Sequence, residues 1–215
     1  MRSKSLTFIS KGLGIMAAIA AIVSSPTWAL DIFVCEPEWK ALLQRHAPEA
    51  NIYSATTDKQ DPHYVQARPS LIAKMRQADL AMCSGAELEV GWLPMLQARS
   101  SNAAVQNGAK SMIYAASFVR MLDTHQHVDR SMGDIHAHGN PHVQFAANDM
   151  IMLSRVVTQR LQAVDPENAP TYQLNGMKFR AHWRKNSTNG KQKLNHYRGN
   201  GLLDITPLTD TYLIG

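Results

Sequence analysis

Apolar positions along residues 30–144 alternate between short unbroken runs and stretches with helical spacing. Short apolar runs bounded by polar residues are typical of strands that are buried on both faces. We expect such strands at residues 30–35, 50–54, 78–83 and 111–115. Helices with one apolar face are expected between them, at residues 36–46, 69–78 and 87–99. This order predicts an α/β fold, in which a parallel sheet has helices on both faces.

Two further helical stretches follow this predicted N-terminal lobe of residues 30–144. Residues 145–164 carry apolar side chains three and four positions apart, and we expect a long connector helix there. A second helix is expected from Pro166 to about Lys185, followed by one candidate strand at residues 202–205. Because a single strand cannot form a sheet, residues 165–215 are predicted to be the start of an incomplete second α/β lobe.

The first 29 residues have the features of a secretory signal peptide. They combine basic residues near the start, an apolar run from Leu13 to Val23 and a small-residue end, with cleavage expected after Ala29. The alternative is a membrane anchor, but a membrane span needs about 20 apolar residues, more than this run contains. We therefore expect the protein to be exported.

Setting the leader aside changes the charge of the chain. The whole sequence has 22 Lys and Arg against 17 Asp and Glu, whereas the residues after the leader have 19 against 17. The net charge falls from +5 to +2, and no dense Lys/Arg block remains. Nucleic acid is therefore not expected as a partner.

Two of the nine histidines follow a proline at the expected carboxyl edge of the sheet. His63 comes after the second predicted strand and His142 after the fourth. Ligands of open parallel sheets bind beyond the carboxyl ends of the strands. Asp61 and Asn140 are each placed to accept the second ring N–H of the nearby histidine, as metal-bound histidines usually require. Either histidine alone could be an ordinary loop residue, but two such turns at one edge favour a metal site.

Two His-x-His pairs lie between these turns, His125 with His127 and His136 with His138. An exposed pair of this kind forms a weak and adaptable metal-binding patch. The patch could collect ions near a tighter site, or His136 or His138 could enter that site. A solvated loop is the alternative interpretation.

Sequence motifs of common enzymes are absent from the chain. It has no Gly-x-Ser-x-Gly, no phosphate-binding P-loop and no His-Glu-x-x-His. Asp61 or Glu36 could act as general base towards a metal-bound water, but nothing in the sequence singles out such a role. We therefore do not expect an enzyme.

Three segments together resemble a known family: Asp61-Pro62-His63, the stretch from Pro69 to Glu89 that ends in Gly-Ala-Glu-Leu-Glu, and Asn140-Pro141-His142. In this order they resemble the zinc- and manganese-type periplasmic metal-binding proteins, which are the solute-binding proteins of ABC importers. The resemblance spans roughly residues 30–185. It implies two α/β lobes joined by a long helix, with the metal held between them and His63 and His142 as ligands from the first lobe. We find no counterpart of the second-lobe ligands, so the chain resembles a C-terminally truncated member.

The resemblance also implies a function. A monomeric protein of this kind captures a transition-metal ion in the periplasm and delivers it to the membrane permease of an ABC transporter. Imidazole ligands suit Zn²⁺, whereas Mn²⁺ prefers more carboxylate, so Zn²⁺ is expected ahead of Mn²⁺. The alternatives are a metal-dependent hydrolase and a truncated relative that has lost its function.

The two cysteines, Cys35 and Cys83, end the first and third predicted strands. In an oxidising compartment an isolated pair is more often a disulfide than a metal site. In a sheet of order 2-1-3-4 these strands are neighbours ~4.8 Å apart, close to the Cα separation that a disulfide accepts. A disulfide is favoured, and a thiol contribution to metal binding is the alternative.

Overall fold

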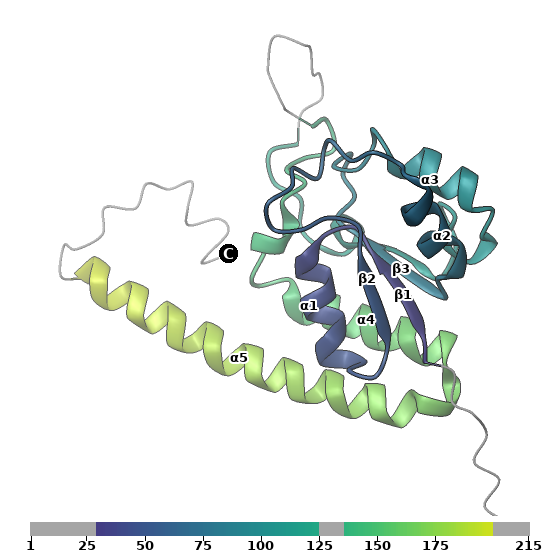
Figure 1. Cartoon of the computed structure of the whole chain (residues 1–215). Coiled ribbons are helices and arrows are strands. Elements are labelled where there is room, and N and C mark those ends of the chain that lie inside the picture. The colour runs from purple at the N-terminus through teal and green to yellow at the C-terminus, as the bar shows by residue number, and fades with distance from the viewer. Residues whose placement is uncertain (1–28, 125–135, 200–215) are drawn as a thin grey trace, which may run out of the picture.

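A four-stranded parallel sheet forms the centre of the protein. The computed structural model describes residues 29–124 and 136–199, with side chains of the last helix described as far as residue 192. The strands are β1 (Asp31–Val34), β2 (Asn51–Ser54), β3 (Leu80–Cys83) and β4 (Met112–Tyr114), in the order β2-β1-β3-β4 (Figure 1). The predicted α/β class, strand order and parallel direction are confirmed.

Helices cover both faces of this sheet. Alternate residues of the central strands point to opposite faces, so Ile32 and Leu80 belong to one core and Phe33 and Ala81 to the other. The first core is closed by α1 (Pro37–His46) and α4 (Met150–Val164), and the second by α2 (Pro69–Gln77) and α3 (Leu93–Ser100). Burial on both faces explains why these strands appear as unbroken apolar runs in the sequence. Short 3-10 turns lie at η1 (Ala103–Val105), η2 (Ala115–Phe118), η4 (Val143–Phe145) and η5 (Pro166–Asn168).

Two helices begin later than the sequence predicts. The helix expected from residue 87 begins at Leu93, because the preceding turn has three successive residues with positive φ and Pro94 fits only the first turn of a helix. The helix expected from residue 145 begins at Met150, after the separate turn η4.

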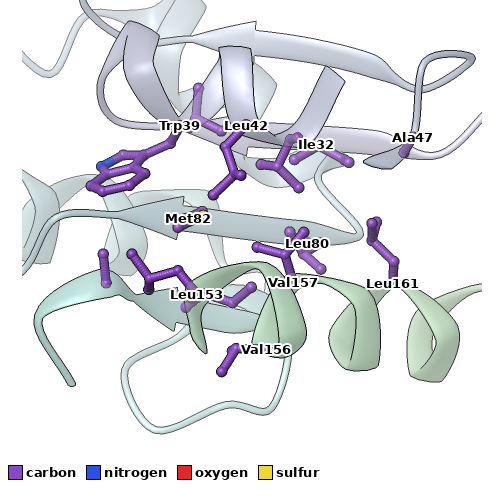
Figure 2. Close-up of a cluster of buried hydrophobic side chains, with 14 of the residues drawn as sticks. Ile32, Trp39, Leu42, Ala47, Leu80, Met82, Leu153, Val156, Val157 and Leu161 are labelled. Atoms are coloured by element: carbon purple, nitrogen blue, oxygen red, sulfur yellow. The ribbon is translucent and has the colours of Figure 1, made fainter. Parts of the chain in front are cut away.

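Helix α4 packs on the sheet. Leu153, Val157 and Leu161 are fully buried, and Figure 2 shows them pointing from α4 toward Leu80 and Met82 of β3. The apolar spacing recognised in the sequence is therefore the stripe that covers the sheet.

Helix α5 (Ala169–Gly199) is the longer of the two C-terminal helices. Its first half packs on α4 and α1, and its second half extends beyond the rest of the lobe (Figure 1). The close approach to α4 depends on Gly176, because a Cβ there would overlap the Oγ1 atom of Thr158. The division of the chain at residues 144 and 165 remains a prediction.

Several predicted features lie outside the described residues: the signal peptide, His125 and His127, and the candidate strand at residues 202–205. Within the part of the chain that the structure describes, no helix is both long and apolar enough to cross a bilayer.

Candidate metal-binding site

His63 lies in the loop between β2 and α2, beyond the carboxyl edge of the sheet. Asp61 Oδ1 accepts hydrogen bonds from the backbone N–H of His63 at 3.0 Å and from its ring Nδ1–H at 2.7 Å. These two bonds lower the pKa of Asp61, so its carboxylate is charged and can only accept. Because Nδ1 carries the proton, Nε2 keeps the lone pair that a metal requires. The predicted contact between Asp61 and the His63 ring is confirmed.

His136 and His142 meet His63 at this edge. The Nε2 atoms of His63 and His136 are 3.2 Å apart, and the two rings stack with their centroids at 5.3 Å. The ring of His142 approaches His63 edge-on, with a centroid distance of 6.1 Å. The structure thus brings together three of the four histidines that the sequence selected.

The surroundings of the His142 ring favour its neutral form. Desolvation by burial is the main cause that lowers its pKa, and the proximity of the His63 ring, which would repel a second positive charge, lowers the pKa further. A neutral imidazole is the form that binds a metal ion, so protons compete less strongly for this ring than for an isolated histidine.

His138 lies apart from the three stacked rings. Its side chain is 73% exposed, and its Nδ1 is 3.2 Å from Glu87 Oε1. The other oxygen of the same carboxylate, Oε2, is 4.0 Å from Nδ1 of His136. Glu87 therefore faces both histidines, one at the rim and one inside the group of rings. The sequence reasoning did not select Glu87, although its position directly after β3 places it at the edge where ligands were expected.

The backbone before Glu87 is strained in a way that fixes its direction. Gly85, Ala86 and Glu87 have φ values of 79°, 49° and 69°, all in the left-handed region. That conformation costs a non-glycine residue about 1–2 kcal/mol. A Cβ on Gly85 would lie 3.1 Å from Cβ of Tyr114, so the turn also favours a residue without a side chain at this position. The result is a tight turn that carries Glu87 to the histidine loop.

Asn140 shapes the loop before His142 instead of contacting its ring. Its Oδ1 accepts a hydrogen bond from the backbone N–H of His142 at 3.0 Å, so the predicted contact with the ring was wrong. An asparagine side chain commonly accepts from the backbone N–H two residues on, and Asn140 makes this local turn. The adjacent Gly139 has a φ of 104°, and a Cβ there would lie 2.7 Å from the carbonyl oxygen of Leu122.

Trp92 connects the His63 loop to the start of α3. The side chain is 1% exposed, and its Nε1–H donates to the carbonyl oxygen of Pro62 at 2.8 Å. Because Pro62 directly precedes His63, this bond restrains the backbone from which the imidazole projects.

A pair of buried carboxyl groups, Glu36 and Glu89, lies at the same edge. Both are 2% exposed. Burial raises the pKa of both groups, and the charge of Glu89 raises that of Glu36 further. Ser84 N–H donates to Glu89 Oε1 at 2.7 Å, and Gly85 N–H donates to Glu89 Oε2 at 3.0 Å. This burial argues against the role of general base that the sequence left open for Glu36.

Cys35 and Cys83 form a disulfide, with their Cα atoms 4.8 Å apart. The bond joins the neighbouring strands β1 and β3 at their carboxyl ends, as expected from the strand order. It therefore ties together the two strands whose following turns carry Glu36 and Glu87.

Comparison with known proteins identifies the family. Residues 34–203 match the family described as ZnuA, zinc-uptake complex component A, periplasmic. The chain belongs to this family. The resemblance carried by the three sequence motifs is thereby confirmed, and with it the relation to periplasmic metal-binding proteins.

Solved structures share the fold at low sequence identity. A crystal structure of ZnuA aligns with a TM-score of 0.60 and 21% identity, over 75% of this chain and 59% of that one. The manganese-bound and cadmium-bound forms of a periplasmic metal binding protein from Candidatus Liberibacter asiaticus align with TM-scores of 0.57 and 0.53. Both are 20% identical and are matched over 73% of this chain and 53% of theirs. The chain thus spans little more than half the length of these proteins. A comparison with curated protein sequences gives no match.

Proposed function

We propose that this chain is a periplasmic solute-binding protein that captures a transition-metal ion, Zn²⁺ above all, and delivers it to the permease of an ABC importer. The observation that carries the proposal is the 3.2 Å separation of the His63 and His136 Nε2 atoms, with the His142 ring beside them. Zinc–nitrogen bonds of about 2.0–2.1 Å at tetrahedral angles place two ligand atoms roughly 3.3–3.4 Å apart. The separation therefore suits one ion bound to both nitrogens.

We assign His63, His136 and His142 as the ligands from this lobe. Asp61 acts behind His63, where it fixes the tautomer and the ring orientation. We assign His138 with Glu87 to the rim, where an exposed imidazole and a carboxylate can pass an ion to the three inner histidines. A second lobe, as the family resemblance implies, would supply any further ligand.

The donor set favours zinc over manganese. Three imidazoles suit Zn²⁺, Cu²⁺, Ni²⁺ or Fe²⁺, whereas Mn²⁺ prefers sites richer in carboxylate. The structural relatives hold manganese or cadmium as well, so the metal has to be determined by direct competition. We expect Zn²⁺ to displace Mn²⁺ from this chain.

Calorimetric titration of Zn²⁺ into the metal-stripped protein tests the proposal. We expect one-to-one binding that weakens by at least about 100-fold, ~2.7 kcal/mol, in the His63→Ala/His142→Ala double variant. The matched control is His182→Ala, which removes an exposed histidine of α5 and should leave zinc affinity unchanged. Equal affinity in the double variant and the wild type would contradict the proposal.

Delivery is a separate step and needs its own measurement. The zinc-loaded chain should stimulate ATP hydrolysis by its importer reconstituted in lipid vesicles, and the His63→Ala/His142→Ala variant should not. Tight zinc binding without stimulation would retain the binding site and reject the transport role.

A further inference from the structure

A second group of metal-ligating atoms lies at the ends of β1 and β3. The sulfur atoms of Cys35 and Cys83 and a carboxylate oxygen of Glu89 are all within 4.8 Å of one another. The two cysteines are fully buried and Glu89 is 2% exposed. No histidine of the proposed zinc site belongs to this group, so it is a different centre.

Glu36 supplies an independent sign that this group lacks a ligand. It is 2% exposed and follows Cys35 directly. Its Oε2 accepts hydrogen bonds from the backbone N–H of Ser84 at 3.2 Å and from its hydroxyl at 3.0 Å. Its other oxygen, Oε1, accepts no hydrogen bond from an N–H or hydroxyl group among the described residues, and the Glu36 carboxyl group is hydrogen-bonded to that of Glu89. Two buried carboxyl groups in contact need a proton or a cation between them, and a bound metal ion would take the place of that proton.

We propose that reduction of the Cys35–Cys83 disulfide turns this group into a second metal site for a thiophilic divalent ion such as Zn²⁺ or Cd²⁺. The ligands are the two cysteine thiolates and the Glu89 carboxylate, with Glu36 adjacent. A dithiol reductant provides the two electrons and two protons that break the S–S bond, and itself becomes a disulfide. Metal binding then displaces one proton from each thiol to solvent.

The local structure supports this ligand set. Sulfur ligands on a tetrahedral zinc ion lie about 3.8 Å apart, given bonds of ~2.3 Å. Once the disulfide is broken, rotation of the two side chains can bring the sulfurs to that separation. The N–H groups of Ser84 and Gly85 already orient the Glu89 carboxylate, as outer hydrogen bonds do in metal sites. In the disulfide form the sulfurs are bonded to each other and cannot act as thiolate ligands, so the oxidation state decides whether the site exists.

Cobalt titration of a chain that lacks two of the three proposed histidine ligands tests the proposal. The full chain carrying His63→Ala/His142→Ala is prepared in disulfide and thiol forms, and alkylation after unfolding verifies the number of thiols. Co²⁺ is then titrated anaerobically with a phosphine reductant present for the thiol form. We expect the thiol form to bind one Co²⁺ more than the disulfide form, with a sulfur-to-cobalt charge-transfer band.

Two variants assign the ligands. Cys35→Ser/Cys83→Ser should lose the additional ion and the band, and Glu89→Gln should weaken Co²⁺ binding by at least about tenfold. Circular dichroism establishes that each variant is folded, and the comparison of the two oxidation states of one chain holds even if a variant unfolds. Equal cobalt binding by the two forms, or an additional ion without a sulfur band, would overturn the proposal. Either result leaves the proposed histidine site untouched.

Discussion

Replacing Asp61 with alanine should weaken zinc binding by about 10- to 100-fold, the range found when a group that orients a metal-bound histidine is removed. Asp61 makes two contacts with His63, one to the ring and one to the backbone, and alanine removes both. Without the ring contact the proton is free to move to Nε2, which blocks the lone pair that faces His136. Asp61→Asn keeps an acceptor for the backbone N–H, so we expect its loss to be near the lower end of the range.

The assay is competition for Zn²⁺ against a chromophoric chelator at fixed pH and ionic strength. Asp58→Ala is the matched control, because Asp58 is an exposed acid of the same loop and its removal changes the net charge equally. An Asp61→Ala affinity within a factor of two of the wild type would refute the reasoning. An equal loss in Asp58→Ala would attribute the effect to negative charge near the site rather than to the hydrogen bonds.

Three further changes test the fold around the site. Burial lowers the pKa of His46, so the stability that the neutral ring contributes is complete above the unfolded value of about 6.5 and is lost as the pH falls through the folded pKa. Between pH 7 and pH 5, urea unfolding should therefore show a smaller loss of stability in His46→Gln than in the wild type. Trp92→Phe removes the hydrogen bond to Pro62, so it should lower the free energy of unfolding by about 0.5–1.5 kcal/mol and also weaken zinc binding. Zinc affinity that stays unchanged in a titration, while thermal unfolding shows the loss of stability, would contradict the role of Trp92 in holding the His63 loop. Leu153→Ala should lower the free energy of unfolding in urea by about 2–5 kcal/mol. Met152 is 52% exposed, so Met152→Ala should lower it by less than about 0.5 kcal/mol. Equal losses in the two variants would reject the placement of α4 on the sheet.

The strands could be predicted from the sequence because burial on both faces requires apolar runs. Residues 31–34 and 80–83 have this pattern, and each is followed by a helical stretch. The contact between the Asp61 carboxylate and the His63 ring was also predicted, whereas the same two-residue spacing at Asn140 gives a bond to the backbone N–H of His142 instead. Local spacing therefore predicts that such a side chain turns back onto the nearby chain, but not which group of the histidine it contacts.

The disulfide between Cys35 and Cys83 is a long-range contact that the order of the strands made predictable. The residues are 48 positions apart, but the order 2-1-3-4 makes their strands neighbours. The prediction succeeded because the sheet reduces a long-range contact to the spacing between two adjacent strands.

Only the tertiary structure decided which distant side chains meet. His136 contacts His63 across 73 residues, and Glu87 faces His138 because a strained turn directs it there. The apolar stripe of α4 has the same spacing whatever it covers, so the sequence could not show that this stripe lies against the sheet. Helical periodicity records that one face is buried, but the partner of that face is set by the packing of the whole lobe.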